Sequence, residues 1–334
     1  MVAPRVVVTG GAGFIGSHTC KALAAAGFVP VTVDNLSNGI AEAVKWGPLE
    51  LGSLEDPGFL DDVFRRHKPL AVLHFAASIE AGESMKVPAK FYRNNVAGTL
   101  ALTEAMARAR ISVLIFSSTA AVYGNSEVMP ITEALPLLPV NPYGRSKLIS
   151  EMILADLAAT TDLRFTALRY FNASGADPDG DLGENHQPET HLIPLVLQAA
   201  YGIRPSIKIF GNDYDTPDGT CIRDYIHVSD LAHAHLLALR RLLGGGDSAQ
   251  MNLGTGKGFS VREIVETTAA VTGRPINAID EARRAGDPAV LVADAAMARQ
   301  VLGWSPRFID VQDHIRHAAG WMERKMALPE VLSA

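Results

Sequence analysis

The sequence predicts an α/β protein in which a doubly wound parallel sheet is followed by a smaller C-terminal α/β lobe. Two observations lead to this fold class. Along the first half of the chain, short and continuously apolar stretches alternate with longer stretches of helical character. After about residue 172, glycine, aspartate, asparagine and proline become frequent. Strands that are apolar at every position are typical of a parallel sheet covered by helices on both faces.

The predicted strands of the first half are short apolar runs, as expected of strands buried in a sheet. They cover residues 6–9, 31–34, 71–75, 113–117 and 164–169. Helices are predicted between them, over residues 14–26, 59–67, 88–108 and 142–159. This order of strand and helix supplies the crossover connections that parallel strands require.

The second half contains two polar segments, residues 172–189 and 211–219, which are predicted to be irregular loops. Residues 244–247 separate a helix from a short strand at 251–253, and further helices are predicted at 261–272, 295–302 and 311–325. We therefore expect a main domain of residues 1–171, to which segments near 220–254 return. Residues 172–334 would mainly form the smaller lobe.

The composition is that of an ordinary globular protein, with 48% hydrophobic and 20% charged residues among 334. The net charge of −6 and the lack of a basic block argue against a nucleic-acid partner. Cys20 and Cys221 form neither a disulfide framework nor a zinc pattern. Neither a signal peptide nor an apolar run long enough to span a membrane is evident, so we expect a cytoplasmic protein.

The segment Thr9–Gly16, Thr-Gly-Gly-Ala-Gly-Phe-Ile-Gly, connects the first strand to the first helix. Glycines permit a tight turn and let backbone amides approach a pyrophosphate, which the helix N-terminus stabilises. Asp34 ends the second strand, where a carboxylate accepts hydrogen bonds from the ribose and repels a 2′-phosphate. Together these features predict a Rossmann-type domain that binds NAD in preference to NADP.

Tyr143 and Lys147 lie four residues apart in a predicted helix, so both side chains project from one face. A nearby ammonium favours the ionised form of a phenol, because opposite charges attract. A tyrosine with a lowered pKa can exchange a proton near neutral pH. With the NAD turn, the pair predicts proton transfer coupled to hydride transfer.

The chain resembles the extended short-chain dehydrogenase/reductase superfamily over nearly its whole length, and within it the UDP-glucose 4-epimerases. Segments typical of the superfamily are residues 8–18, 33–37, 74–77, 94–99 and 117–124. Segments more typical of the epimerases are residues 169–172, 211–214, 218–228, 252–256 and 283–287. The resemblance implies reversible C4 epimerisation of a UDP-hexose in galactose metabolism, with residues 1–171 binding NAD and 172–334 mainly binding UDP-sugar.

The same resemblance implies roles for individual residues, which fall into two sets. Contacts to NAD are implied for Gly10, Gly13, Phe14, Ile15, Gly16, Asp34, Asn35, Leu36, Ser53, Leu54, Phe75, Ala76, Ala77, Asn95, Ser117, Tyr143, Lys147 and Tyr170. Contacts to the UDP-sugar are implied for Thr119, Tyr143, Asn172, His191, Leu192, Arg223, Met251, Arg284 and Asp287. Arginines suit the diphosphate because a guanidinium fork matches phosphate oxygens.

The catalytic residues implied are Tyr143, Lys147 and Thr119. Hydride would move from sugar C4 to NAD while Tyr143 takes the O4 proton, and hydride would return to the opposite face of the 4-keto sugar. Thr119 would hydrogen-bond O4, and Lys147 the nicotinamide ribose. A homodimer is also implied, through helices near 88–109 and 142–160. Alanines on these helices permit close approach, namely Ala97, Ala101, Ala105, Ala155 and Ala158.

Three positions depart from the family pattern. Glu80 stands where a lysine is frequent, Ser53 where an aspartate usually reaches adenine, and Met251 at a position matched to a gate of the sugar pocket. Methionine is intermediate in size and flexible, so we expect weak acceptance of N-acetylated sugars.

Several other functions share this framework. Dehydratases and decarboxylases on the same fold carry an acid and base after the threonine, whereas this chain has Ala120 and Ala121. A dehydrogenase that releases NADH, a UDP-xylose/UDP-arabinose or UDP-GlcNAc epimerase, and an NAD-sensing module stay open as alternatives. His227, His233 and His235 resemble metal ligands, but the last two cannot share a helix face, and no metal site is expected.

Overall fold

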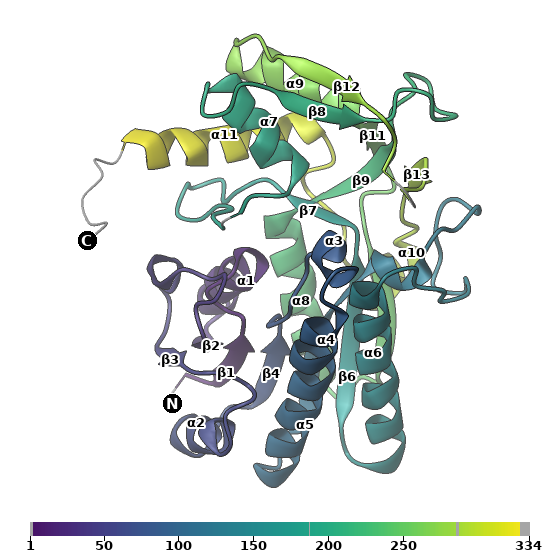
Figure 1. Cartoon of the computed structure of the whole chain (residues 1–334). Helices are drawn as coiled ribbons and strands as arrows, with labels where there is room; N and C mark the ends of the chain where they lie inside the picture. Colours follow the sequence, from purple (N-terminus) through teal and green to yellow (C-terminus); the bar gives the residue numbers. More distant parts are fainter. Residues whose placement is uncertain (1–2, 187, 285–286, 328–334) are drawn as a thin grey trace.

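The computed structural model describes residues 3–186, 188–284 and 287–327. Its centre is a seven-stranded parallel sheet in the order β10-β6-β5-β4-β1-β2-β3 (Figure 1). The strands are β1 (Arg5–Thr9), β2 (Val29–Asp34), β3 (Leu49–Leu51), β4 (Ala71–His74), β5 (Val113–Thr119), β6 (Arg164–Tyr170) and β10 (Ala249–Leu253). The chain runs outward from β1 to β3, then returns to add β4 on the other side of β1. The predicted doubly wound α/β class is confirmed.

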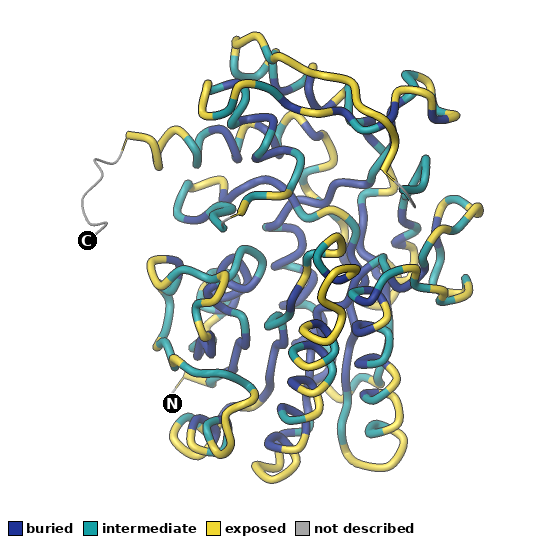
Figure 2. The backbone as a smooth tube through the Cα atoms, in the orientation of Figure 1, coloured by how far each residue is buried: buried dark blue, intermediate teal, exposed yellow. Residues whose placement is uncertain are grey.

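Each face of this sheet has its own hydrophobic core, because successive residues of a strand such as β1 point to opposite faces. Val6 and Val8 pack with α1 (Phe14–Ala25) and α8 (Val228–Leu243), whereas Val7 packs on the opposite face. The helices of that second face are α2 (Phe59–His67), α5 (Gly98–Arg108) and α6 (Pro142–Thr160). Successive strand residues point to opposite faces, so a strand buried on both is apolar throughout. Figure 2 shows these strands as the buried centre of the molecule.

The helix predicted over residues 88–108 is interrupted. It begins as α4 (Pro88–Phe91), after the short α3 (Ala81–Ser84), passes through a π-helical segment Tyr92–Ala97, and continues as α5. Asn95 lies in the π-helical segment, and its side chain contacts two other segments. Such π-turns are frequent near functional sites, and no spacing rule predicts one.

Besides α8 and β10, the C-terminal half contributes two small sheets and four helices within the described residues. In one sheet β9 (Ile222–His227) lies between β11 (Gly258–Ser260) and β13 (Val290–Leu291), and β7 (Asn172–Ser174) also pairs with β9. The other pairs β8 (Ile207–Phe210) with β12 (Ala278–Glu281). The helices are α7 (Leu192–Ala200), α9 (Val261–Thr272), α10 (Ala296–Leu302) and α11 (Val311–Ala327). Three of them share a third core with β8 and β9, whereas α10 packs against β10 and α8.

Segments from the second half also join the main sheet. β10 pairs with β6 as the edge strand, and α8 packs against α1. β9, by contrast, belongs to the small sheet. The proposed division of the chain at residue 171 stays a prediction.

Candidate active site

Most of the predicted NAD contacts follow the carboxyl ends of parallel strands. The turn Gly10–Gly16 follows β1, Asp34 ends β2, residues 53–54 follow β3, and residues 75–77 follow β4. Ser117 lies near the end of β5 and Tyr170 at the end of β6. In doubly wound sheets ligands bind at this edge, where the strand order reverses, and here the reversal lies between β1 and β4.

The glycine turn fits a dinucleotide. Gly10 has φ +72°, and a Cβ on it would lie 2.6 Å from the Ala76 amide nitrogen, so the turns after β1 and β4 touch through this glycine. A Cβ on Gly16 would meet the Gly10 carbonyl oxygen at 2.2 Å. Gly13 differs, because a Cβ there would approach only the Gly10 oxygen, at 3.3 Å. Close packing against other backbone atoms requires glycine at positions 10 and 16. Position 13 has no such close neighbour, so the backbone there is accessible to a pyrophosphate.

Asp34 is held beside this turn. Its carboxylate accepts hydrogen bonds from the backbone amides of Ala12 at 3.0 Å and Leu36 at 2.8 Å. Leu36 has a left-handed φ of 58°, which aims its amide back at the carboxylate. Burial raises the pKa of Asp34, and the backbone amides oppose that effect. The carboxylate and the glycine turn therefore form one preorganised unit.

Tyr143 and Lys147 lie in the first two turns of α6. Asn141 caps this helix by accepting a 2.8 Å hydrogen bond from the Gly144 amide, and Pro142 occupies its first turn. Lys147 is 3% exposed, and its ammonium donates to the backbone carbonyl of Ser117 at 2.8 Å. The Thr119 hydroxyl, at the end of β5, is near enough to the Tyr143 phenol to lower its pKa. The three predicted catalytic residues thus meet between β5 and α6.

The pKa of Tyr143 differs from the value expected from the sequence, where a neighbouring Lys147 ammonium was expected to lower it. Burial raises the pKa of Tyr143, the Thr119 hydroxyl lowers it, and the Glu80 carboxylate raises it further. Burial also lowers the pKa of Lys147 to about 7. The pKa of Tyr143 therefore lies above its usual value, because desolvation is the largest influence on it.

The side chains of Tyr170 and Asn95, which are also predicted to contact NAD, form hydrogen bonds within the protein. The Tyr170 hydroxyl is hydrogen-bonded to the Ser117 hydroxyl. Asn95, 2% exposed, accepts from the Ser78 amide at 2.8 Å and donates to the Ser146 hydroxyl at 2.8 Å. Asn95 thereby ties the turn after β4 to α6, and its contact with a cofactor stays a prediction.

The residues after Thr119 are alanines in a short 3-10 turn, Ala120–Tyr123. The Thr119 hydroxyl accepts a 3.1 Å hydrogen bond from the Ala121 amide, which orients it at the end of β5. The methyl groups of Ala120 and Ala121 cannot transfer protons. The acid and base that a lyase would place here are therefore missing from these two positions.

Six of the predicted UDP-sugar contacts come from the C-terminal lobe. Arg223, on β9, has a side chain 11% exposed and lies 3.5 Å from the Asp287 carboxylate. Arg284 stacks over the Phe210 ring, with its guanidinium carbon 3.9 Å from the centroid. The other three begin short elements: Asn172 begins β7, His191 caps α7, and Leu192 begins α7.

The prediction that Met251 gates the sugar pocket is wrong. Met251 lies in β10, paired with Leu168 of β6, and is 0% exposed within the hydrophobic core. A side chain with no accessible surface in the ligand-free protein does not line a substrate pocket. It is fixed by the packing of Leu168, Leu231 and Trp304 in that same core.

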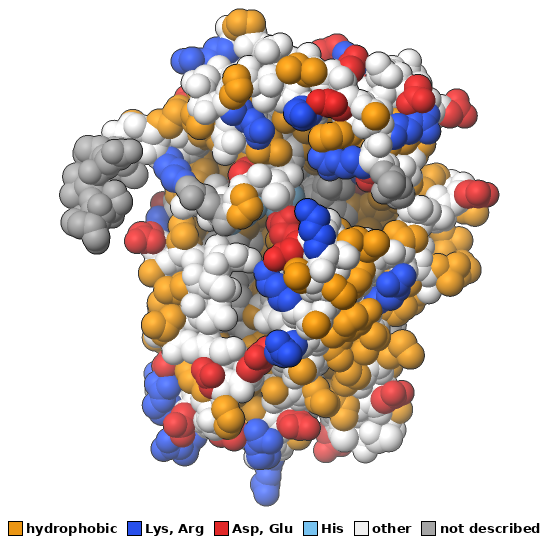
Figure 3. Space-filling view, viewed as in Figure 1, with side chains coloured by type: hydrophobic (Ala, Val, Ile, Leu, Met, Phe, Trp, Pro, Cys, Tyr) orange, Lys and Arg blue, Asp and Glu red, His pale blue; other side chains and the backbone are white. Residues whose placement is uncertain are grey.

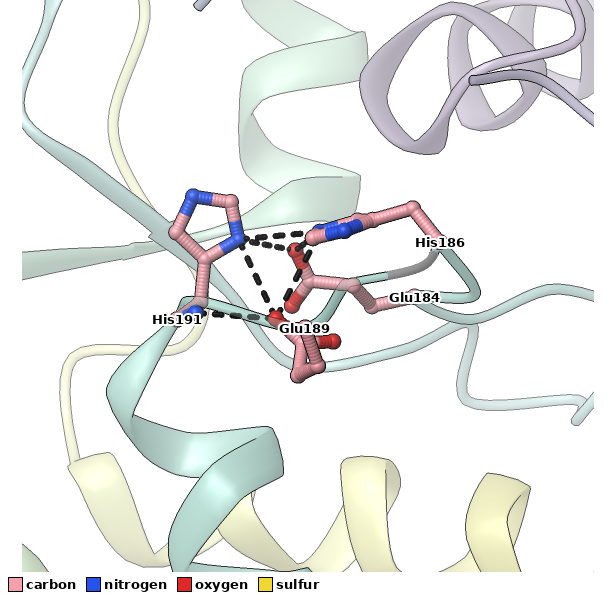
Figure 4. Close-up of side chains that lie close together, drawn as sticks. All are labelled: Glu184, His186, Glu189 and His191. Atoms are coloured by element: carbon pink, nitrogen blue, oxygen red, sulfur yellow. Dashed lines mark hydrogen bonds and ion pairs between the residues drawn. The ribbon is translucent and has the colours of Figure 1, made fainter. Parts of the chain in front are cut away.

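Two of the three histidines considered as metal ligands, His227 and His235, are bonded to other groups. His227 is bonded to His317 at 3.0 Å, and His235 is bonded to the Leu231 carbonyl at 2.8 Å and packs on Phe75. The structure instead brings together Glu184, His186, Glu189 and His191 in the loop before α7 (Figure 4). Sequence reasoning missed this group, although the spacing Glu-x-His-x-x-Glu-x-His in eight residues was visible.

Among the helices of the described residues, none combines the length and apolar character needed to cross a membrane. The family model described as the NAD dependent epimerase/dehydratase family matches residues 6–254. The UDP-glucose 4-epimerase of Rhizobium meliloti (strain 1021) is 53% identical over 321 residues, which are 96% of this chain and 98% of that protein. That of Azospirillum brasilense is 52% identical, covering 96% of this chain and 92% of the relative.

Solved structures agree with this relationship. The crystal structure of UDP-glucose 4-epimerase from Brucella ovis in complex with NAD is 52% identical, with a TM-score of 0.93, and covers 95% of this chain and 98% of its own. The Bifidobacterium longum enzyme in complex with NAD+ and UDP is 37% identical, with a TM-score of 0.91, and covers 96% and 99%. The matched sequence, the shared fold and the glycine turn with Tyr143 and Lys147 thus lead to one conclusion: this chain belongs to the NAD dependent epimerase/dehydratase family.

Proposed function

We propose that this protein interconverts UDP-glucose and UDP-galactose by epimerising C4 with bound NAD. The observation that carries the proposal is that α6 brings Tyr143 and the buried Lys147 to the end of β5, where Thr119 is followed by Ala120 and Ala121. This arrangement handles one proton at one sugar oxygen. A reaction that removes a proton from O4 and returns it needs no second acid or base.

Each residue has a defined part in this reaction. When bound, NAD supplies the hydride acceptor at C4 and returns the hydride to the opposite face. Tyr143 takes the O4 proton and gives it back, and Thr119 orients O4 toward the phenol. Lys147, anchored near Ser117, would donate to the nicotinamide ribose. A cationic nicotinamide beside Tyr143 would favour the phenolate, which opposes the effect of burial.

Substrate binding is assigned to the C-terminal lobe. Arg223 and Arg284 are placed to bind the diphosphate, because both guanidinium groups belong to the lobe that faces the carboxyl edge of the main sheet. Asp287 restrains Arg223 in the ligand-free protein. Asn172 at the start of β7, and Leu192 with the backbone of His191 at the start of α7, would position the UDP moiety.

A homodimer through α4, α5 and α6 is part of the proposal. Leu100 is 42% exposed and Met152 58% exposed, and hydrophobic side chains gather over these helices in Figure 3. Ala97 and Ala155 are exposed there as well, whereas Ala105 is buried in the core and does not serve the interface. Sedimentation equilibrium should give twice the chain mass, and Met152→Glu should give a monomer.

A cytoplasmic location is also proposed. Cys20 and Cys221 are both buried free thiols, which suits a reducing compartment. Burial raises the pKa of each thiol, with Cys20 reaching about 12, so neither behaves as a reactive thiolate.

The deciding experiment incubates purified protein with UDP-galactose and no added NAD, followed by separation of the UDP-sugars. We expect UDP-glucose to accumulate to an equilibrium mixture, with NAD copurifying and no net NADH formed. Parallel reactions with UDP-GlcNAc and UDP-arabinose test the alternative epimerases. Formation of stoichiometric NADH or of a 6-deoxy-4-keto sugar would contradict the proposal.

A further inference from the structure

Four side chains from the loop between β7 and α7 converge on one point (Figure 4). The His186 Nε2 atom lies 3.2 Å from a Glu184 oxygen, 3.4 Å from a Glu189 oxygen and 3.3 Å from the His191 Nδ1 atom. His191 Nδ1 lies 2.5 Å from Glu184 and 3.7 Å from Glu189. The cluster therefore presents two imidazole nitrogens and two carboxylate oxygens to a single small volume.

Two of these side chains are oriented by the backbone around them. His186 Nδ1 is bonded to the Pro188 carbonyl at 3.0 Å, so Nδ1 carries the hydrogen and Nε2 presents its lone pair to the cluster. The Glu189 carboxylate accepts from the amides of Thr190 and His191, both at 2.8 Å. A backbone partner that holds the distal imidazole nitrogen is the usual support of a metal-bound histidine.

A cation would balance the charges of the cluster. The Glu184 and Glu189 side chains are only 6% and 10% exposed. Two carboxylates withdrawn from water require two compensating positive charges. Protonation of both histidines is one source of that charge, because a ring nitrogen of each lies within hydrogen-bond reach of the Glu184 carboxylate. A divalent ion supplies the same charge and accepts a lone pair from each neutral imidazole.

We propose that Glu184, His186, Glu189 and His191 bind a divalent transition-metal ion of the zinc type. Zinc takes imidazole nitrogen and carboxylate oxygen in a tetrahedron, and bonds of about 2.0–2.2 Å place the ligand atoms about 3.3–3.6 Å apart. Four of the five separations measured, 3.2, 3.3, 3.4 and 3.7 Å, already lie near this spacing. Only the 2.5 Å contact between Glu184 and His191 has to open on binding.

The site is structural, because four protein ligands leave no coordination position for a substrate. The bound ion would stabilise the loop that ends at His191, the N-cap residue of α7. Glu184 is connected to α11 as well, since its carbonyl accepts from the Trp321 indole at 3.2 Å. The bound ion therefore stabilises the junction of this loop with α7 and α11, whatever reaction the main site performs.

A second acidic cluster in the same loop provides a contrast. Asp177, Asp179 and Asp181 also lie close together, but the Lys21 ammonium occupies their centre at 2.7, 2.7 and 2.9 Å. The lysine already supplies the positive charge there. Asp179 is thus a matched control for loss of one carboxylate from this loop.

The experiment measures metal content on tag-free protein. Elemental analysis should find about one zinc ion per chain after gel filtration. Chelator-treated protein titrated with Zn²⁺ alone should regain that content, with an increase in Tm. His186→Asn and Glu189→Gln should lose most of the zinc, and Asp179→Asn should retain it. Wild-type protein that takes up no zinc and shows no change in Tm overturns the proposal, as do His186→Asn and Glu189→Gln variants that bind zinc like wild type.

If the variants fail to fold, a second measurement tests the proposal on the wild-type protein alone. Chelator-treated wild-type protein is loaded with Co²⁺, whose visible spectrum reports coordination geometry. Intense bands of a tetrahedral nitrogen and oxygen site support the assignment. A weak spectrum like that of the hydrated ion contradicts it.

Discussion

The ammonium of Lys147 donates a 2.8 Å hydrogen bond to the backbone carbonyl of Ser117, near the end of β5. The bond holds the lysine against the sheet, one turn along α6 from Tyr143, with the Phe116 ring 4.9 Å from the ammonium. Because this environment is buried, the pKa of Lys147 falls to about 7. The residue therefore changes charge within the physiological pH range.

Lys147 should make the stability of the nucleotide-free protein increase with pH. Between about pH 7 and pH 10.5 the unfolded chain carries the lysine proton and the folded chain does not, so the free energy of unfolding rises across this window. We expect Lys147→Met to be more stable than wild type at pH 7, by roughly 2–5 kcal/mol, and to lose most of this slope. Denaturant unfolding at several pH values measures both, with exposed Lys86→Met as the control. Equal slopes in wild type and Lys147→Met would contradict the assignment.

Tyr143→Phe should remove the proton acceptor and leave the binding site intact. We expect turnover to fall by roughly 10²- to 10⁴-fold, because general base catalysis typically contributes that much. NAD content and UDP affinity should stay near wild type. Tyr201→Phe is the control, since the Tyr201 hydroxyl bonds Glu323 on the surface. Near-normal turnover of Tyr143→Phe would show that another group accepts the proton.

Glu80 should set part of the pH dependence of the reaction. Its carboxylate raises the pKa of Tyr143, so Glu80→Gln should lower that pKa and favour the phenolate. The acid limb of the kcat/KM profile should then move to lower pH, by less than about one pH unit. Thr190→Val is the matched control, because it removes the 3.1 Å hydrogen bond to Glu80 and keeps the charge. An unshifted profile in Glu80→Gln would rule out this influence.

The buried ion pair of Glu151 and Arg169 should matter for stability. These side chains are 4% and 5% exposed and meet at 2.5 Å, and Arg169 also donates to the Tyr123 hydroxyl at 2.9 Å. Glu151→Ala leaves a buried guanidinium without its partner, so we expect about 3–5 kcal/mol of destabilisation in denaturant unfolding. Asp62→Ala, which breaks an exposed pair with Arg65, should cost at most about 1 kcal/mol. Equal effects of the two would argue against a buried pair.

The main sheet was predictable because each long strand carries a local pattern. Val6–Val8 and Val113–Ser117 are apolar on both faces, and each is followed by a helix or a turn. The strands that sequence reasoning missed are mostly short, such as β13 with two residues and β3 and β11 with three. So few residues show no periodicity, and these strands form only because partners lie alongside.

The chemistry of the site was predictable to the extent that it depends on nearby residues. The turn Gly10–Gly16 and the pair Tyr143 and Lys147 are local patterns, and Asp34 is recognised by its place at the end of the next strand. The residue sequence alone was therefore enough to indicate NAD binding and proton transfer at a sugar oxygen. Their meeting at one sheet edge follows from a general property of parallel strands.

Tertiary packing determined the properties that depend on burial and on distant partners. It placed Met251 in the core and, through desolvation, raised the pKa of Tyr143 above its usual value. It also brought Glu184 and His191 together, in a loop whose path is held by Trp321 of α11. Solvent exposure and distances between remote residues depend on the packing of the entire chain, and the spacing of residues along the sequence does not encode them.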